Sequence, residues 1–208
     1  RIPNHTGRKI FYWSDSTEAN KGREFSWGAG GLSTAERALF DNSLDLFNYL
    51  RGDRSGEVAK QGNFRDRLDS TVLGDISHSS PAFSKETQTV FVGANDGMLH
   101  AFTTKPLGAN GLPAGSEMFA YIPSTALPKM KALAATNYNN NHQYYVDGDI
   151  AVSNKVTTSD RIYLIGLLGR GGKGMFGLDV TTPESFSAAD VKWEYTNPLD
   201  SDLGFMLG

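Results

Sequence analysis

Carboxylate and imidazole side chains are the first candidates for chemistry, because such groups bind metal ions and transfer protons. The set consists of Asp75, His78, Asp96, His100, Asp147 and Asp149. Ligands in known metal sites recur at short, fixed spacings, whereas these residues are scattered over different predicted strands and turns. We therefore predict that the aspartates accept hydrogen bonds from turn amides and that the histidines are core or rim residues. Metal binding by the set is the alternative.

A glycine motif offers a second candidate, a cofactor loop. Gly169, Gly171 and Gly174 have the Gly-x-Gly-x-x-Gly spacing of a dinucleotide-binding loop. That loop needs a helix directly after it, because the helix N-terminus binds the pyrophosphate. Residues 175–183 read instead as a strand, so we predict a hairpin turn. A Walker phosphate loop fails as well, since Gly174 follows Lys173 where a hydroxyl side chain is required.

Residues for covalent catalysis are absent or badly spaced. The chain has no cysteine, which excludes disulfides, thiolate zinc sites and cysteine nucleophiles together. It has no Gly-x-Ser-x-Gly elbow, and the adjacent His78 and Ser79 do not make a triad by adjacency. We predict no catalytic residue, no cofactor in this chain and no enzymatic activity.

The tripeptide Arg51-Gly52-Asp53 is a candidate receptor-binding motif. Exposed, it can bridge an integrin, with the guanidinium meeting a carboxylate and the aspartate completing the receptor's metal coordination. At a helix end the same residues have a structural role: a cation near the last carbonyls, a glycine cap and a polar exit. We favour the structural role and keep receptor binding as the alternative.

Composition limits the classes of partner. The formal net charge is -3, from 20 basic and 23 acidic residues mixed along the chain, which argues against a nucleic-acid partner or a polybasic membrane anchor. Hydrophobic residues make up 39%, enough for a core, and no apolar stretch reaches the length of a membrane span. Residues 1–5 carry no apolar signal region, and the chain begins without methionine. We therefore expect a fragment of a longer protein, with any signal peptide outside it.

One amphipathic helix is predicted in the N-terminal segment, residues 1–70. Ser33 and Glu36 have the spacing of a capping box, and the apolar residues that follow recur at helical spacing. Arg51 and Gly52 are typical of the C-terminal end of a helix. We place the helix at about 34–50.

From Thr71 onward the pattern is that of β-strands in a recurring unit. Gly74-Asp75-Ile76 recurs as Gly148-Asp149-Ile150, 74 residues later. Val90-Phe91-Val92 matches Ile162-Tyr163-Leu164 after 72 residues, and Phe119-Ala120-Tyr121 matches Trp193-Glu194-Tyr195 after 74. Four strands at a fixed period are typical of propeller blades. We predict an all-β fold: residues 71–208 form about two blades of a β-propeller and the start of a third at Asp202-Leu203-Gly204, incomplete at the C-terminus.

An ordered set of motifs resembles the C-terminal propeller of the PilC/PilY family of type IV pilus proteins. The motifs are Leu73–Pro81, Val92–Phe102, Ala120–Pro123, Tyr144–Gly148, Gly171–Gly174 and Leu178–Thr181, preceded by Tyr49–Asp53 and Phe64–Arg67. Together they cover roughly residues 30 to 208 in the family's order.

The resemblance implies a secreted, non-enzymatic factor that promotes pilus assembly, opposes retraction in twitching motility, and acts as an adhesin at the pilus tip. Its expected partners are the minor and major pilins and a host surface receptor. Its expected location is extracytoplasmic, at the outer membrane, cell surface or pilus tip of a Gram-negative bacterium. Exposed connections such as Thr104–Ser116 and residues 137–143 are the candidate binding segments.

Family members carry a calcium loop in the propeller, but its acidic pattern is missing here. Val92 and Ala94 stand where ligating oxygens are needed before Asp96, and Asp147-Gly148-Asp149 lacks the following glutamate. Calcium is therefore expected only in the full-length protein.

Two other functions stay open at the level of sequence. Ala94-x-Asp96-x-x-x-His100-Ala-Phe102 partly matches the blade motif of pyrroloquinoline quinone dehydrogenases, although its later positions differ. A generic outer-membrane assembly propeller would share the fold without a pilus phenotype.

Overall fold

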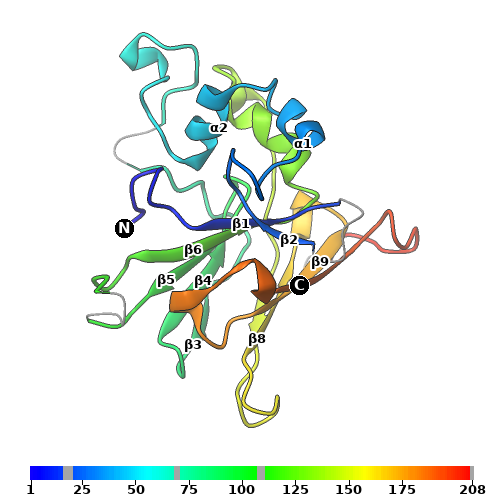
Figure 1. The fold of residues 1–208 in the computed structure, drawn as a ribbon. Helices are drawn as coiled ribbons and strands as arrows, with labels where there is room; N and C mark the ends of the chain where they lie inside the picture. The colour runs from blue at the N-terminus through cyan, green and yellow to red at the C-terminus, as the bar shows by residue number, and fades with distance from the viewer. Residues whose placement is uncertain (16–20, 68–70, 107–110, 207–208) are drawn as a thin grey trace.

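The computed structural model describes residues 1–15, 21–67, 71–106 and 111–206, and its strands form two sheets packed face to face (Figure 1). The first sheet has the strand order β2-β1-β6-β5-β4-β3 and the second has the order β10-β9-β8-β7. The strands are β1 Ile10–Trp13, β2 Gly22–Glu24, β3 Ala82–Ser84, β4 Thr89–Gly93, β5 Leu99–Thr103, β6 Glu117–Ile122, β7 Ile150–Val152, β8 Tyr163–Leu167, β9 Gly174–Asp179 and β10 Val191–Thr196.

Each sheet contains one four-stranded antiparallel meander, β3 to β6 in the first and β7 to β10 in the second. The turn predicted at Asn95-Asp96-Gly97 joins β4 to β5, and Gly97 there has φ 97°, a value that favours glycine. The first strands of the two meanders, β3 and β7, lie beside each other. Stacked meanders of this kind are the arrangement of neighbouring propeller blades.

The strand register corrects the predicted repeat at two places. Across the first meander, Ala82, Phe91, Ala101 and Phe119 lie opposite one another in one row, and Ala151, Ile165, Gly177 and Trp193 form the matching row of the second. Phe91 therefore corresponds to Ile165, at 74 residues rather than 72. The first strand of the first unit is β3, and the strand predicted at Gly74 is wrong.

Gly74 instead lies against the β4–β5 turn. Its amide donates to Asp96 Oδ2 at 2.9 Å, and the amide of Asn95 donates to the carbonyl of Asp75. A Cβ on Gly74 would lie 2.3 Å from the amide nitrogen of Asp96, so only glycine permits this approach. The glycine that suggested a strand is thus required by a turn contact.

The N-terminal segment is built into the first sheet. β1 pairs in parallel with β6, and β2 pairs antiparallel with β1, so two strands precede the predicted start of the β region at Thr71. The division at residue 70 therefore does not separate two cores.

The helix predicted at 34–50 is two helices, α1 Thr34–Ala38 and α2 Leu44–Arg51. Asp41 and Asn42 have φ of 56° and 54° and break the helix between them. Ser33 and Glu36 form the predicted capping box, and a second cap, Ser43, accepts from the amide of Leu46.

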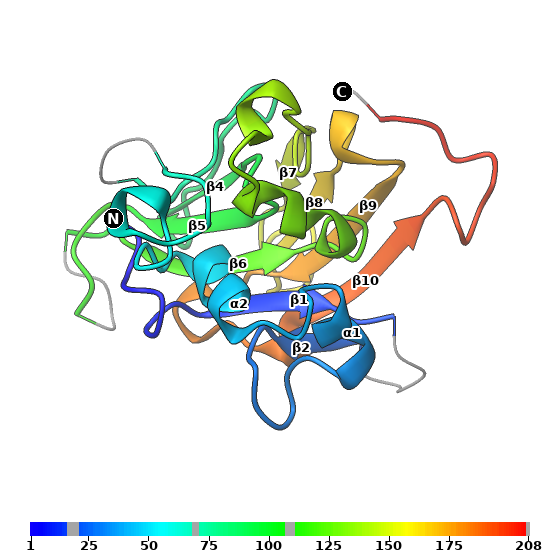
Figure 2. The same ribbon diagram turned by 90° about the horizontal axis from the view of Figure 1, so that it is seen from above.

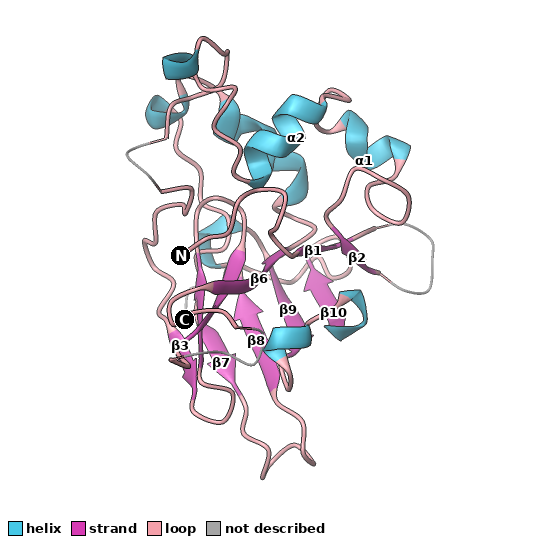
Figure 3. Ribbon diagram, turned by 60° about the vertical axis from the view of Figure 1, so that its left-hand side comes forward, coloured by secondary structure: helices cyan, strands magenta, loops and turns pink. Residues whose placement is uncertain are grey.

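Two apolar clusters form the core. One lies between the two sheets and includes Phe91, Phe119, Tyr121, Leu164 and Phe176. The other lies between the first sheet and the helices, to which the 3₁₀ helix Leu127–Ala134, inserted between β6 and β7, contributes. Figure 3 shows α1 and α2 gathered above one end of the sheets, and Figure 2, seen from above, shows them lying over β1 and β2. Short 3₁₀ helices also lie at Val58–Lys60, Tyr138–Asn140, Gly169–Gly171, Pro183–Ser185 and Ala188–Asp190. Within the described ranges, no helix is both long and apolar enough to cross a membrane.

Candidate functional site

Five of the six residues considered as metal ligands, all except Asp149, lie in separate histidine–aspartate pairs, one of which is completed by His142. His78 Nδ1 lies 2.7 Å from Asp147 Oδ2, His142 Nε2 lies 3.0 Å from Asp75 Oδ1, and His100 Nε2 lies 3.1 Å from both oxygens of Asp96. Among the described residues, no group of three or more acidic, histidine or cysteine side chains is placed to hold a metal ion. The aspartates accept turn amides as well: Asp147 accepts from His78 and Asp96 accepts from Gly74 and Met98.

His100 belongs to a buried charged network that the sequence does not reveal. Its Nδ1 lies 2.7 Å from Glu117 Oε1, and Arg8 binds both oxygens of Glu117 at 2.8 Å. Burial alone would lower the pKa of His100, but the carboxylates of Asp96 and Glu117 outweigh it and raise that pKa to about 9. Burial alone would raise the pKa of Glu117, but His100 and Arg8 lower it to about 2. Asp96 and His100, the two polar residues of the partial quinone-type motif, are thus bound to each other.

The glycine motif at 169–174 forms the hairpin connection that the sequence predicts. Gly169–Gly171 is a 3₁₀ turn between β8 and β9, and β9 follows where a dinucleotide site needs a helix. A Cβ on Gly171 would lie 1.5 Å from the carbonyl oxygen of Tyr145, so close backbone packing accounts for that glycine.

The Arg51-Gly52-Asp53 tripeptide has the geometry of a helix end. Arg51 is 7% exposed, and its guanidinium donates to the carbonyls of His5, Phe25 and Arg8. Gly52 is the C-cap of α2 with φ 115°, and Asp53 accepts from the amide and hydroxyl of Ser55. Receptor binding through Arg51 would require three internal hydrogen bonds to break, so this geometry opposes the receptor role and favours the structural one.

A buried polar contact fastens the two sheets together. Tyr121 Oη at the end of β6 donates to Glu194 Oε1 on β10 at 2.5 Å, and the amide and hydroxyl of Ser124 donate to the same carboxyl group. Burial raises the pKa of Glu194 to about 7 and that of Tyr121 well above its usual range. We call Tyr121, Ser124 and Glu194 the seam clasp. Glu194 gave no sequence signal, because one acidic residue in an alternating strand usually faces solvent.

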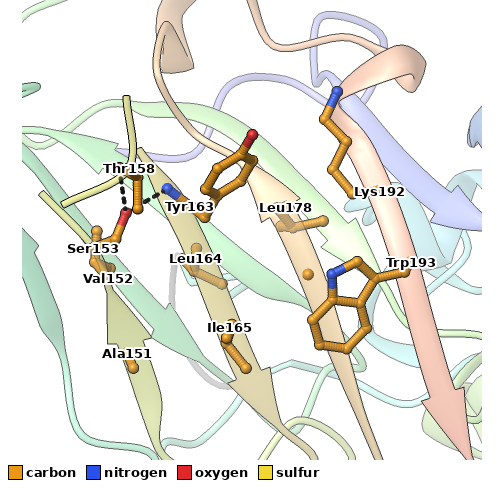
Figure 4. A pocket seen from close by; sticks show the side chains of 11 residues that line it. Ala151, Val152, Ser153, Thr158, Tyr163, Leu164, Ile165, Leu178, Lys192 and Trp193 are labelled. Carbon is orange, nitrogen blue, oxygen red and sulfur yellow. Dashed lines mark hydrogen bonds between the residues drawn. The ribbon is translucent and has the colours of Figure 1, made fainter. Parts of the chain in front are cut away.

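The outer face of the second sheet is apolar and open. Residues of β7, β8, β9 and β10 line a cavity of about 730 Å³ on this face. Figure 4 shows their side chains. Its lining includes the whole row Ala151, Ile165, Gly177 and Trp193, with Tyr163 and Lys192. Ile165 is 41% exposed and Trp193 is 38% exposed, which is unusual for apolar side chains that alternate with buried ones along a strand.

A family model described as the PilY1 beta-propeller domain matches residues 67–204. A type IV pilus biogenesis factor PilY1 homolog of Xylella fastidiosa is 36% identical over 198 residues, which cover 81% of this chain and 15% of that protein. The type IV pilus biogenesis factor PilY1 of Pseudomonas aeruginosa strain PAK is 35% identical over 237 residues, covering 96% of this chain and 19% of the relative. The crystal structure of the Pseudomonas aeruginosa PilY1 C-terminal domain is 37% identical, covers 57% of this chain and 20% of that one, and superposes with a TM-score of 0.37. The chain thus spans less than a fifth of these curated relatives.

Proposed function

The chain belongs to the PilY1 family as part of its β-propeller, and we propose on that premise that it serves in type IV pilus biogenesis. The observation that carries the proposal is the family match over residues 67–204, which contain both four-stranded meanders. The relatives that align over most of this chain carry the name of pilus biogenesis factor.

Within that role, we propose a non-enzymatic scaffold that acts outside the cytoplasm, at the tip of the pilus, and promotes attachment to surfaces. The strands are committed to the stacked sheets, so binding belongs to the connections between them. The proposed partners are the minor and major pilins and a surface receptor. Calcium stays an expectation for the full-length protein only.

The two predicted binding segments lie at opposite ends of the first sheet. The connection 104–116 precedes β6 and residues 137–143 follow it, so β6 runs from one segment toward the other. Residues 107–110 of the first segment lie outside the described residues, while Asn139, Asn140 and Asn141 of the second are exposed. Loss of attachment on mutation of only one segment would show which end meets the partner.

Deletion of the whole gene tests the proposal. We expect few or no surface pili by electron microscopy, a normal pool of pilin by immunoblot, and recovery when the gene is returned. Immunogold labelling of the complemented strain then tests tip placement. Normal pili in the deletion strain would contradict the proposal, and a quinone chromophore in the purified protein would favour the dehydrogenase instead.

A further inference from the structure

A polar cleft of about 240 Å³ lies where residues 137–143 meet the turn between β4 and β5. Its lining comes from three stretches of the chain: the approach to the first sheet, the β4–β5 turn, and the insert between β6 and β7. The polar side chains of that lining include Arg65, Arg67, Asp75, Asp96, Asn139 and His142. A concave surface on which a few polar groups converge is a candidate ligand site, and here it includes one of the two binding segments that the sequence predicts.

Arg65 is the arginine of this cleft that has no acidic partner among the described residues. Its Nε donates to the carbonyl of Leu133 at 3.0 Å, and its guanidinium carbon lies over the ring of Tyr138, 4.8 Å from the centroid. Within the described ranges, its two Nη groups make no hydrogen bond or ion pair. The side chain is only partly exposed, and a charge withdrawn from water normally has a partner. Arg65 is therefore a fixed guanidinium with its binding fork still available.

The other charged groups of the cleft already have partners. Arg67 lies 3.3 Å from Glu57, His142 Nε2 lies 3.0 Å from Asp75 Oδ1, and Asp96 belongs to the buried network described above. The two aspartates disfavour a dianion such as phosphate in the same cleft, because like charges repel. A single negative charge suits this balance. The two oxygens of a carboxylate also match the planar fork of a guanidinium.

The rest of the cleft suits hydroxyl groups. The side-chain amide of Asn139 makes no hydrogen bond within the described part of the chain, so it offers both a donor and an acceptor. The side chain of Asp75 is 52% exposed, and a carboxylate can accept more hydrogen bonds than those it has here. The cleft is smaller than the roughly 300–1,000 Å³ of pockets for drug-sized ligands, so it has room for about one sugar ring.

We infer that this cleft binds an acidic sugar, with Arg65 holding the carboxylate while Asn139 and Asp75 bond the hydroxyl groups. The inference rests on the proposed role in surface attachment for its biological use and names a ligand class for residues 137–143. Uronic acids and sialic acids share the required chemistry. The acidic side chain of a peptide is the competing source of a carboxylate, which the experiment separates.

Titration of the complete protein, purified from the bacterium, tests the ligand class. The probes are glucuronic acid, N-acetylneuraminic acid, glucose, acetate and a blocked acidic peptide, and ligand-observed NMR measures the binding of each. Glucose has the ring of glucuronic acid without the carboxylate, whereas acetate has the carboxylate without the ring. We expect a sugar acid to bind at least ~10-fold more tightly than glucose, acetate or the peptide, because a hydrogen bond to a charged group adds to those of the ring. Equal binding of any of these three, or no binding of either sugar acid, would overturn the inference.

Three variants of the complete protein locate the binding. Arg65→Gln removes the guanidinium and should weaken binding of the sugar acid at least ~10-fold. Asn139→Ala, at an exposed position, should weaken it roughly 3- to 10-fold through the loss of neutral hydrogen bonds. Lys85→Gln removes an exposed cation in the β3–β4 turn and, as the control, should bind like the wild type. Circular dichroism shows whether each variant is folded. Unchanged binding in folded Arg65→Gln would overturn the inference, and so would unchanged binding in Asn139→Ala if Arg65→Gln does not fold.

The titration needs no pili, so its result stands apart from that of the gene deletion. Normal pili in the deletion strain would remove the proposed role in biogenesis and leave the binding by the cleft in place. Absence of binding by the wild-type protein would remove the acidic-sugar site and leave the role in biogenesis in place.

Discussion

At the scale of single residues, the packing of the two sheets depends on a titratable group, the carboxyl group of Glu194. It is 8% exposed, accepts from Tyr121 and Ser124 across the sheet interface, and lies near the carboxylate of Asp15, which also raises its pKa. Burial opposes the charged form, and the hydrogen bonds only partly offset it. The sheets therefore bind each other more tightly when Glu194 is protonated.

This linkage predicts a specific pH dependence. The folded-state pKa of about 7 is higher than the ordinary value of 4.5, so the folded protein binds the proton more tightly between these values. The contribution of Glu194 to the free energy of unfolding is fully present below about pH 4.5 and is lost as the pH rises through 7. The total change is on the order of 3 kcal/mol. Urea unfolding at pH 5 and pH 7.5 should show this loss in the wild type and not in Glu194→Gln. Glu86→Gln, at an exposed position, is the control and should behave as the wild type. The same loss of stability in Glu194→Gln would contradict the assignment of the pH dependence to Glu194.

Arg51 and Asp53 give a second prediction at this scale. Arg51→Ala leaves three backbone carbonyls without their donor, so we expect a loss of about 2–4 kcal/mol in the free energy of unfolding. Asp53→Glu should keep both folding and attachment to host cells, since Arg51 faces the interior. Loss of attachment by a folded Asp53→Glu protein would restore the receptor role.

At the scale of elements, the N-terminal segment is held to the first sheet by charge as well as by strand pairing. Arg8 precedes β1 and binds Glu117 at the start of β6, and both side chains are 1% exposed. Arg8 also donates to the carbonyl of Arg51, while Arg51 donates to the carbonyl of Arg8. The start of the chain, the end of α2 and the first sheet thus share one network.

Removal of the charge of Glu117 should therefore weaken the attachment of the N-terminal segment to the first sheet. Glu117→Gln leaves Arg8 and His100 buried without their shared carboxylate, and breaking such a pair costs about 3–5 kcal/mol. We expect that loss in urea unfolding, with faster amide hydrogen exchange in residues 8–13. Lys131→Ala breaks an exposed pair with Asp41 and should change stability by less than about 1 kcal/mol. Protected residues 8–13 in Glu117→Gln would show that strand pairing alone holds the segment.

The elements also show what local sequence can predict. The β4–β5 hairpin was predictable because β-branched and aromatic residues flank Asn95-Asp96-Gly97. The break between α1 and α2 was not, because Asp41 and Asn42 adopt positive φ without a glycine or proline to indicate it. The pairing of β1 with β6 joins residues about 110 apart, and no local pattern contains such a contact.

At the scale of the molecule, the repeat predicted stacked blades, while the interface between them came only from the structure. The aromatic-x-Tyr pattern at the end of each unit can be read from the sequence. Only the strand register shows which face of the sheet those residues occupy. The partner of Tyr121 is 73 residues away, so the seam clasp could not be read from spacing. The outward position of Ile165 and Trp193 follows from the same register.

The central claim is that this stretch of propeller serves pilus biogenesis, and the most direct measurement is partial complementation. A strain that lacks the gene receives either the whole gene or the gene without residues 71–196, the segment from the first meander to the end of β10. Surface pili are counted by electron microscopy, and immunoblots confirm that both proteins accumulate outside the cytoplasm. We predict normal pilus numbers with the whole gene and few or none with the shortened one, at an unchanged pilin pool. Normal numbers with the shortened gene would contradict the account.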